Sequence, residues 1–234
     1  MNSFLKTVLL LAIVMALPSK IFGVEADLVE PLRPYVRGVV SEFGQIEAER
    51  KAKLESAARF IRERLAAGKP AELTFICTHN SRRSHLAQVW AQAAAYYYNV
   101  TNVATYSGGT EATACNIRTV RALRRTGMSI VDSTAGTNPV YLAKVAEKQA
   151  PLKLFSKVYS GEGNPAQDFA AVLCCDHADA NCPVVTGAAV RIPVHYKDPK
   201  VSDDTPSESS TYDERARQIA REMFYLMSAV GRAS

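Results

Sequence analysis

Residues Leu73–Ser84 read Leu-Thr-Phe-Ile-Cys-Thr-His-Asn-Ser-Arg-Arg-Ser. The apolar, β-prone run Leu73–Ile76 predicts a short buried strand, and Cys77 stands where that strand should end. Six polar residues follow, and from Ser84 onward the pattern is helical. A strand, a tight loop and a helix N-terminus bind anions well, because free backbone N–H groups and the helix dipole point at the loop. The stretch therefore predicts a cysteine nucleophile in an oxyanion cradle, where positive surroundings favour the thiolate.

Apolar runs and helical patterns alternate through the rest of residues 71–234. Further strands are expected at Val103–Tyr106, Ser156–Tyr159, Ala170–Cys174 and Val190–Val194, and helices at Ser84–Tyr98, Asn116–Arg125 and Tyr212–Val230. Strands separated by helices predict an α/β fold with three layers, in which helices cover both faces of a parallel, doubly wound sheet of about four strands. Ligands of such sheets bind beyond the carboxyl ends of the strands, so Cys77 and Cys174-Cys175 should emerge at one edge.

Residues 1–26 have the pattern of a signal peptide. Lys6 precedes the apolar run Val8–Leu17, which has signal-peptide length and is too short for a comfortable membrane span. Val24-Glu25-Ala26 suits a cleavage before Asp27. We expect a periplasmic or secreted protein without a stable membrane anchor; an uncleaved N-terminal anchor is the alternative.

The composition excludes some classes of partner. The chain has 234 residues, 22% of them charged, and a net charge of +5, which is too mild to indicate a nucleic-acid surface. It has five cysteines, and an odd number in an oxidising compartment leaves at least one thiol free or paired between chains. This count fits a reactive cysteine better than a purely structural set.

Residues 27–70 form a segment of helical character before the core. Gln45–Ala67 carries apolar residues at helical spacing, and Gly68-Lys69-Pro70 should end the helix. We expect a helical N-terminal extension packed on a catalytic domain of residues 71–234; a solvated, partly mobile segment is the alternative.

The motif Cys77-x5-Arg83-Ser84, with Asn80 inside it, resembles the phosphate-binding loop of low-molecular-weight protein tyrosine phosphatases and of their relatives, the thioredoxin-coupled arsenate reductases. The resemblance extends from Leu73 to the C-terminus and implies the fold of that family. It implies that Cys77 attacks phosphorus or arsenic in line, that Arg83 grips two oxygens, that Ser84 donates a hydrogen bond to the thiolate and that Asn80 braces the loop. The oxyanion would be bound by residues of the same loop, namely Thr78, His79, Asn80, Ser81, Arg82 and Arg83. Arg82 replaces a cysteine common in this family.

Asp198-Pro199 stands where the phosphatases carry their general acid, an aspartate before proline late in the chain. The resemblance implies that Asp198 protonates the leaving oxygen. Asp203 and Asp204 are alternative candidates for the general acid. An Asp-Pro turn without a catalytic role is the other interpretation of Asp198-Pro199. Lys200-Val201-Ser202 replaces the tyrosine pair of many phosphatases, which argues against recognition of aryl phosphates.

The segment Cys174–Pro183 resembles the redox segment of the thioredoxin-coupled arsenate reductases. By that resemblance Cys175 and Cys182 relay a disulfide outward. Cys175 attacks the Cys77 adduct; Cys182 then forms a disulfide with Cys175, and an external dithiol reduces that disulfide. A structural Cys175–Cys182 bridge, a metal site with His177, or inert buried thiols are the alternatives. We expect Cys174 and Cys115 to be packing residues.

We therefore expect an arsenate reductase-like enzyme with an oxyanion substrate, arsenate or a phosphate ester, and a thioredoxin-like reductant. No cofactor, metal or nucleic acid is expected. The alternatives are a low-molecular-weight phosphatase that forms a phosphocysteine, with Asp198 as acid, and a non-catalytic oxyanion-binding or redox-sensing protein.

Overall fold

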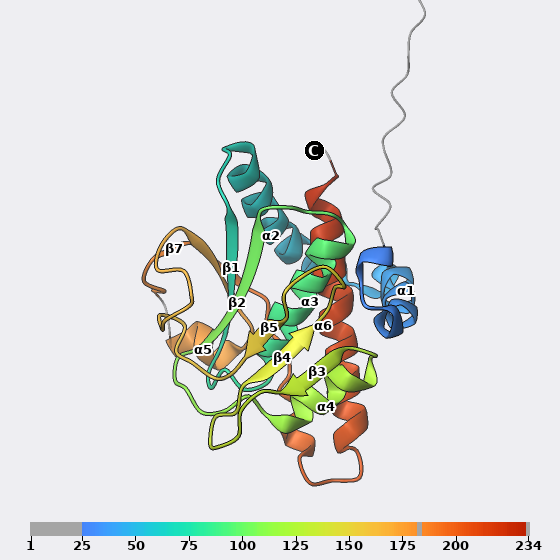
Figure 1. The fold of residues 1–234 in the computed structure, drawn as a ribbon. Helices are drawn as coiled ribbons and strands as arrows, with labels where there is room; N and C mark the ends of the chain where they lie inside the picture. Colours follow the sequence, from blue (N-terminus) through green and yellow to red (C-terminus); the bar gives the residue numbers. More distant parts are fainter. Residues whose placement is uncertain (1–24, 182–183, 233–234) are drawn as a thin grey trace, which may run out of the picture.

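The computed structural model describes residues 25–181 and 184–232. Its centre is a four-stranded, wholly parallel sheet in the order β2-β1-β6-β7, with the first strand β1 in the middle (Figure 1). The strands are β1 Ala71–Cys77, β2 Val103–Gly109, β6 Phe169–Leu173 and β7 Ala188–Pro193. The predicted α/β fold with a parallel sheet of four strands and N-terminal helices is confirmed.

Three long helices form the layer on one side of the sheet: α2 Ala48–Ala66, α3 Arg83–Tyr97 and α6 Glu208–Val230. Helix α3 contacts β1 and β2, α2 contacts β1, β6 and β7, and α6 packs on both helices. The other side is covered in part by the loop around Tyr159, because a Cβ at Gly108 of β2 would lie 2.3 Å from Tyr159 Cα. Parallel crossovers are right-handed, and β6–β7 progresses away from β1 in the opposite direction to β1–β2. Helix α5 (Asp176–Asn181) in that crossover therefore lies on the side opposite α3.

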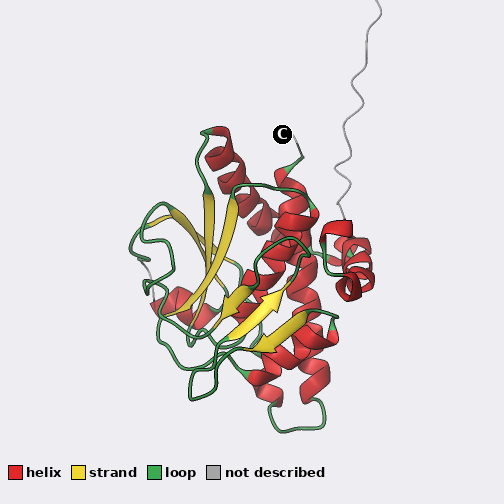
Figure 2. Cartoon of the chain, viewed as in Figure 1, coloured by secondary structure: helices red, strands yellow, loops and turns green. Residues whose placement is uncertain are grey.

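A second, antiparallel sheet was not predicted. It consists of β3 Ser129–Asp132, β4 Tyr141–Lys144 and β5 Leu152–Leu154, and it follows helix α4 (Ile117–Arg125), as Figure 2 shows. Strands of three or four residues are too short to show a reliable hydrophobic period.

The expected strand Ser156–Tyr159 is wrong. These residues form a loop in which only Val158 makes an isolated bridge, to Gly109. The polar groups of this loop are instead used to hold the oxyanion loop, as described below.

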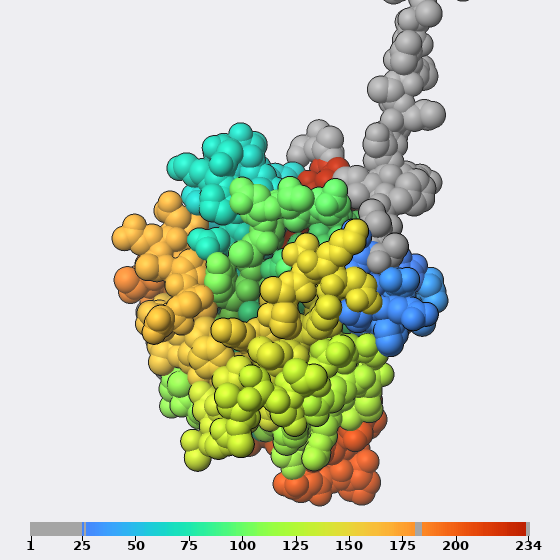
Figure 3. Space-filling model, in the orientation of Figure 1, coloured from blue at the N-terminus to red at the C-terminus, as the bar shows by residue number. Residues whose placement is uncertain are grey.

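The N-terminal helices dock on the main core, and Figure 3 shows the blue surface of the first of them lying directly against the rest of the molecule. On α1 (Arg33–Ser41) the ring of Tyr35 stacks on the Trp90 indole of α3, with 5.4 Å between ring centroids. At the end of α1, Glu42 pairs with Arg217 of α6 at 2.6 Å. Helix α2 ends at Ala66, just before the predicted stop at Gly68, whose φ of 68° favours glycine.

No helix in residues 25–181 or 184–232 is long and apolar enough to cross a membrane. The predicted signal peptide and Cys182 lie outside the described residues, apart from Glu25 and Ala26 at the end of that peptide.

Candidate active site

Cys77 ends β1, and Arg83 begins α3 five residues further on, so the predicted strand, loop and helix are present. The Cys77 thiol is buried, with 3% of the residue exposed, and its Sγ lies 3.1 Å from Ser84 Oγ. Ser84 is itself fully buried. A hydroxyl at this distance can donate a hydrogen bond to a thiolate, which is the role that the resemblance implies for Ser84.

The backbone of the loop is turned so that its carbonyl groups face away from the cradle. They accept hydrogen bonds from the segment after β2: Thr110 N to Cys77 O at 3.1 Å, Glu111 N to Thr78 O at 3.0 Å, Thr113 Oγ1 to His79 O at 3.2 Å and Asn116 N to Ser81 O at 3.0 Å. The backbone N–H groups of residues 78–82 donate to no acceptor in the described part of the chain. Successive unpaired N–H groups in such a turn form an anion-binding concavity.

Asn80 holds the loop in this shape. Its φ of 45° places it in the left-handed region, which asparagine tolerates better than most residues. Its Nδ2 donates to Ser84 Oγ at 2.9 Å, and its Oδ1 accepts from Lys157 N at 2.9 Å. A second donor from the loop that contains Lys157, Ser156 Oγ, donates to His79 O at 2.9 Å. The predicted brace therefore runs through the segment that sequence patterns wrongly assigned to a strand.

Arg83 is held from both ends of its guanidinium group. Nη2 donates to Asp198 Oδ2 at 2.7 Å, and Nη1 donates to the backbone oxygen of Tyr196 at 3.1 Å. The third nitrogen, Nε, is buried and has no hydrogen-bond partner among the described residues. An unpaired buried donor is costly, so an oxyanion in the cradle would satisfy it.

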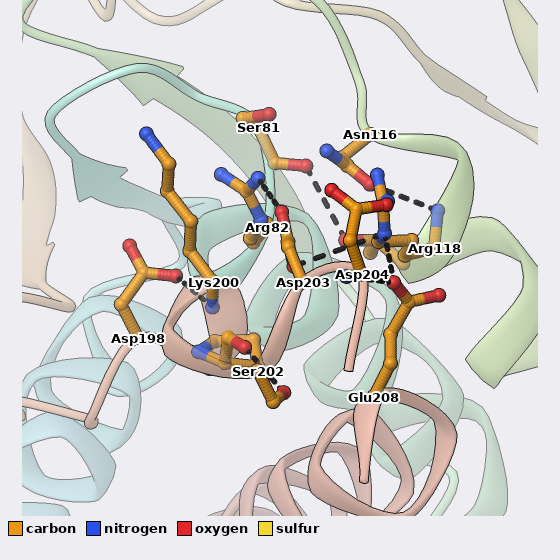
Figure 4. Close-up of polar contacts among 12 residues, drawn as sticks. Ser81, Arg82, Asn116, Arg118, Asp198, Lys200, Ser202, Asp203, Asp204 and Glu208 are labelled. Atoms are coloured by element: carbon orange, nitrogen blue, oxygen red, sulfur yellow. Dashed lines mark hydrogen bonds and ion pairs between the residues drawn. The ribbon is translucent and has the colours of Figure 1, made fainter. Parts of the chain in front are cut away.

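Asp198 is the carboxylate that the fold brings to the loop. Its Oδ1 accepts from Lys200 N at 3.1 Å, as Figure 4 shows. Its Oδ2 binds Arg83. Asp203 binds Arg82 Nη2 at 3.0 Å, and Asp204 binds the guanidinium of Arg118. Of the three aspartates weighed from the sequence, only Asp198 contacts Arg83.

The Arg82 side chain points to α6 rather than to the cradle. Its Nε donates to Tyr212 OH at 2.6 Å, and the same hydroxyl donates to Asp203 at 2.7 Å. Figure 4 shows Arg82 and Asp203 joined in this network, beside Arg118 and Glu208. Arg82 thereby ties the loop to the helix α6 and to the segment that carries Asp198.

A second thiol lies against the loop. Cys175 Sγ is 3.6 Å from Thr78 Oγ1, and the same hydroxyl lies 3.2 Å from His177 Nδ1. Cys175 is fully buried and accepts a hydrogen bond from Ala178 N at 3.3 Å. The expected meeting of Cys77 with the cysteines after β6 at one edge of the sheet is thus observed.

The other described cysteines are buried free thiols. Cys174 follows β6 next to Cys77, since Cys174 N donates to Ile76 O at 2.7 Å, and burial raises its pKa, with the neighbouring Cys77 and Cys175 adding to the rise. Burial raises the pKa of Cys115 to about 12. Among the described residues, no group of His, Cys, Asp and Glu side chains could hold a metal ion.

An open hollow of about 520 Å³ adjoins the loop on one side. Its walls are mostly polar: His79, Ser81, Arg82, Thr113, Asn116 and Lys200. His79 Nε2 lies 2.8 Å from Glu111 Oε1 at this rim. Among the described residues, no Phe, Tyr or Trp side chain lines the hollow.

Three groups that shape the site were missed from the sequence: the Tyr196 carbonyl, the Lys157 amide and His85. His85 is fully buried beside Ser84, with Nδ1 3.1 Å from Ser107 Oγ. Burial, with a smaller effect of the Lys157 charge, lowers the pKa of His85 to about 3, so its ring is neutral. A histidine in the first turn of the helix after the loop was a visible signal in the sequence, whereas the two backbone groups left none.

Solved structures of similar shape include a low-molecular-weight phosphotyrosine phosphatase from Vibrio cholerae, at 14% identity and a TM-score of 0.44, covering 67% of this chain and 94% of that one. An arginine phosphatase from Geobacillus stearothermophilus is similar at 15% identity and a TM-score of 0.41, covering 68% and 91%. No protein-family model matches the chain.

Two curated relatives are arsenate reductases. That of Brevibacillus brevis is 27% identical over 147 residues, which is 63% of this chain and 90% of that protein. That of Bacillus licheniformis is 28% identical over 143 residues, or 61% and 84%. By this similarity the chain is a distant homologue of these arsenate reductases.

Proposed function

We propose that the protein is a thiol-dependent arsenate reductase. The observation that carries the proposal is the contact of a second thiol with the loop: Cys175 Sγ lies 3.6 Å from the hydroxyl of Thr78, the residue after the nucleophile. A phosphatase needs one thiol, whereas reduction of arsenate needs a second one to resolve the adduct on the first. The distant homology to arsenate reductases agrees with this choice.

The proposed cycle starts with arsenate in the cradle, bound by the N–H groups of residues 78–82 and by Arg83. The Cys77 thiolate attacks arsenic, and a hydroxide leaves as water after it takes a proton. The Cys175 thiolate then attacks Cys77 Sγ; the sulfur–arsenic bond breaks, and its electron pair reduces arsenic(V) to arsenic(III), which leaves as arsenite. Cys182 attacks Cys175, which frees Cys77, and an external dithiol of the thioredoxin type reduces the Cys175–Cys182 disulfide.

The surroundings of the loop support a small inorganic oxyanion. The hollow beside it is polar, with Lys200 at its rim in place of an aromatic wall. Its described lining has no Phe, Tyr or Trp ring on which an aryl phosphate could stack, whereas arsenate needs only the cradle itself.

Phosphate-ester hydrolysis is the second candidate, and Asp198 is the observation that favours it. The carboxylate lies next to Arg83, where a general acid could reach a leaving oxygen. In this reaction Cys77 forms a phosphocysteine, water hydrolyses it, and Cys175 takes no part.

A side-by-side assay separates the two candidates. We expect the mature protein to reduce arsenate through many turnovers with a thioredoxin system, and Cys77→Ser to abolish this. Cys175→Ser should reduce arsenate in at most a single turnover. The same substitution should leave the rate of p-nitrophenyl phosphate hydrolysis unchanged. Multiple-turnover reduction by Cys175→Ser would refute the relay, and ester hydrolysis without arsenate reduction would establish the second candidate. Binding of oxyanions with neither activity would point to the non-catalytic alternative.

We also propose that the protein acts after export, through a cleaved signal peptide in residues 1–26. The electron donor would then be a thioredoxin-like protein outside the cytoplasm. Cell fractionation, with N-terminal sequencing of the mature protein, tests this.

A further inference from the structure

Helix α2 of the N-terminal extension brings a charged side chain deep into the molecule. Arg50, in the first turn of α2, has a side chain only 18% exposed. Its Nε and Nη2 lie 2.8 and 2.7 Å from Glu222 Oε2 on α6, and the Glu222 side chain is 4% exposed. Gln218 Nε2 donates to the other carboxylate oxygen at 3.1 Å, so the buried charge of Glu222 is well satisfied. A buried pair of this kind is costly to break from one side.

The same guanidinium covers an aromatic ring of the active-site segment. Arg50 Cζ lies 4.6 Å from the centroid of the Tyr196 ring. Tyr196 is buried; burial raises its pKa, and the charge of Glu222 adds to the rise, so the phenol stays neutral. A guanidinium over a buried ring attracts it and also fixes its plane.

The backbone of Tyr196 is where this contact reaches the chemistry. Its N–H donates to Cys174 O at 3.0 Å, and its carbonyl accepts from Arg83 Nη1 at 3.1 Å. Two residues later Asp198 accepts from Arg83 Nη2 at 2.7 Å. The segment from Tyr196 to Asp198 therefore sets the direction of the Arg83 guanidinium, and with it the direction of the unpaired Nε.

We propose that Arg50 is a positioning residue of the oxyanion site: it clamps the Tyr196 ring and thereby holds Arg83 oriented for the anion. The N-terminal extension would then be part of the active-site machinery and not merely an added layer. This inference rests on the proposed function only for its effect on turnover, because anion binding and the mobility of the segment can be measured without it.

The competing explanation is that Arg50 only fastens α2 to α6. Arg62 offers a matched control, since its Nη1 donates to Ala229 O at 2.8 Å and so joins the same two helices away from Tyr196. The double variant Arg50→Met, Glu222→Gln removes both charges together, so no unpaired carboxylate stays buried. Arg50→Lys keeps the charge but removes the planar group over the ring.

The experiment measures hydrogen–deuterium exchange of residues 194–200 and the dissociation constant of inorganic phosphate, on the full mature protein. We expect the double variant to exchange about tenfold faster at Tyr196 and to bind phosphate about tenfold more weakly. Arg50→Lys should lie between it and the wild type, and Arg62→Ala should match the wild type in both, even where it lowers stability.

The proposal is overturned if the double variant and Arg62→Ala behave alike in exchange and in phosphate affinity. If the double variant does not fold, Arg50→Lys is tested in its place. Wild-type exchange rates and wild-type phosphate affinity in Arg50→Lys would then overturn the proposal. Absence of both arsenate reduction and ester hydrolysis in the wild type would refute the proposed function alone, since exchange and phosphate affinity would still decide the role of Arg50.

Discussion

At the scale of single residues, the oxyanion loop depends on polar side chains that are buried and paired. Asn80 spans the loop with one hydrogen bond to Ser84 and one from Lys157, and Arg83 is held by Tyr196 and Asp198. Such groups specify one geometry because each of them is costly when left without a partner. His85 is a further buried polar side chain next to this loop, and because its ring is kept neutral, the stability of the protein depends on pH.

We predict that His85 lowers stability in mild acid. The folded protein keeps His85 neutral, with a pKa of about 3, whereas the unfolded chain takes up a proton below its ordinary value of about 6.5. The unfolded state therefore binds more protons between these values, and stability falls as the pH falls through this window. Between pH 7 and 5.5 the free energy of unfolding should drop by about 1 kcal/mol more in the wild type than in His85→Gln. Urea unfolding at the two pH values measures this. An equal drop in the free energy of unfolding in the two proteins would contradict the prediction.

At the scale of elements, the site is made where the ends of two neighbouring parallel strands meet. Cys77 pairs in register with Gly109, the last residue of β2. The chain after Gly109 turns over the loop and donates to its carbonyls through Thr110 and Glu111. The approach is so close that β2 must end in a residue without a side chain.

We predict that Gly109→Ala damages the loop. A Cβ there would lie 2.2 Å from Glu111 O, 2.6 Å from Thr78 O and 2.8 Å from Asn80 N, and backbone atoms cannot move aside cheaply. We expect a loss of about 1–3 kcal/mol in stability and a loss of most turnover. Gly44→Ala is the matched control, because nothing lies within 4 Å of its new Cβ and its effect should stay within about 0.5 kcal/mol. Urea unfolding and the arsenate and ester assays would show it; a Gly109→Ala protein as stable and active as the control would be inconsistent with this account.

At the scale of the whole molecule, the N-terminal helices and the α/β core share one hydrophobic interior. Tyr35 stacks on Trp90, and Arg217 Cζ lies 4.6 Å from the centroid of the Tyr35 ring. Leu54 and Ile61 of α2 are fully buried in the same cluster as the strands of the sheet. The described chain should therefore unfold as one cooperative unit.

We predict that Tyr35→Ala lowers the free energy of unfolding by about 1–3 kcal/mol, because it removes a half-buried ring from this contact. Tyr35→Phe keeps the ring and should cost less than about 1 kcal/mol. Trp90 is the protein's single tryptophan, so its fluorescence reports on the contact directly. Fluorescence and circular dichroism should give one coincident transition in the wild type; separate transitions would show that the extension unfolds on its own.

The sequence by itself determined the nucleophile and its setting. The β-prone run before Cys77, the polar loop and the helix after it are local patterns, and a strand or helix forms largely from such neighbours. The parallel sheet followed from the alternation of strands and helices, and the end of α2 followed from Gly68.

Only the tertiary structure decided which distant groups meet at the loop. Asp198 is 115 residues from Arg83; the proline after it favoured it over Asp203 and Asp204, but only the fold shows that it contacts Arg83. The Tyr196 carbonyl and the Lys157 amide are backbone groups that almost any residue would supply. The loop Ser156–Tyr159 resembled a short strand because Val158 and Tyr159 are β-prone residues. Arg50 is a charged position between the apolar residues of Gln45–Ala67, and only packing against α6 buries it beside Tyr196. These contacts depend on how the elements assemble, because long-range packing and burial are properties of the folded chain and not of any short stretch of it.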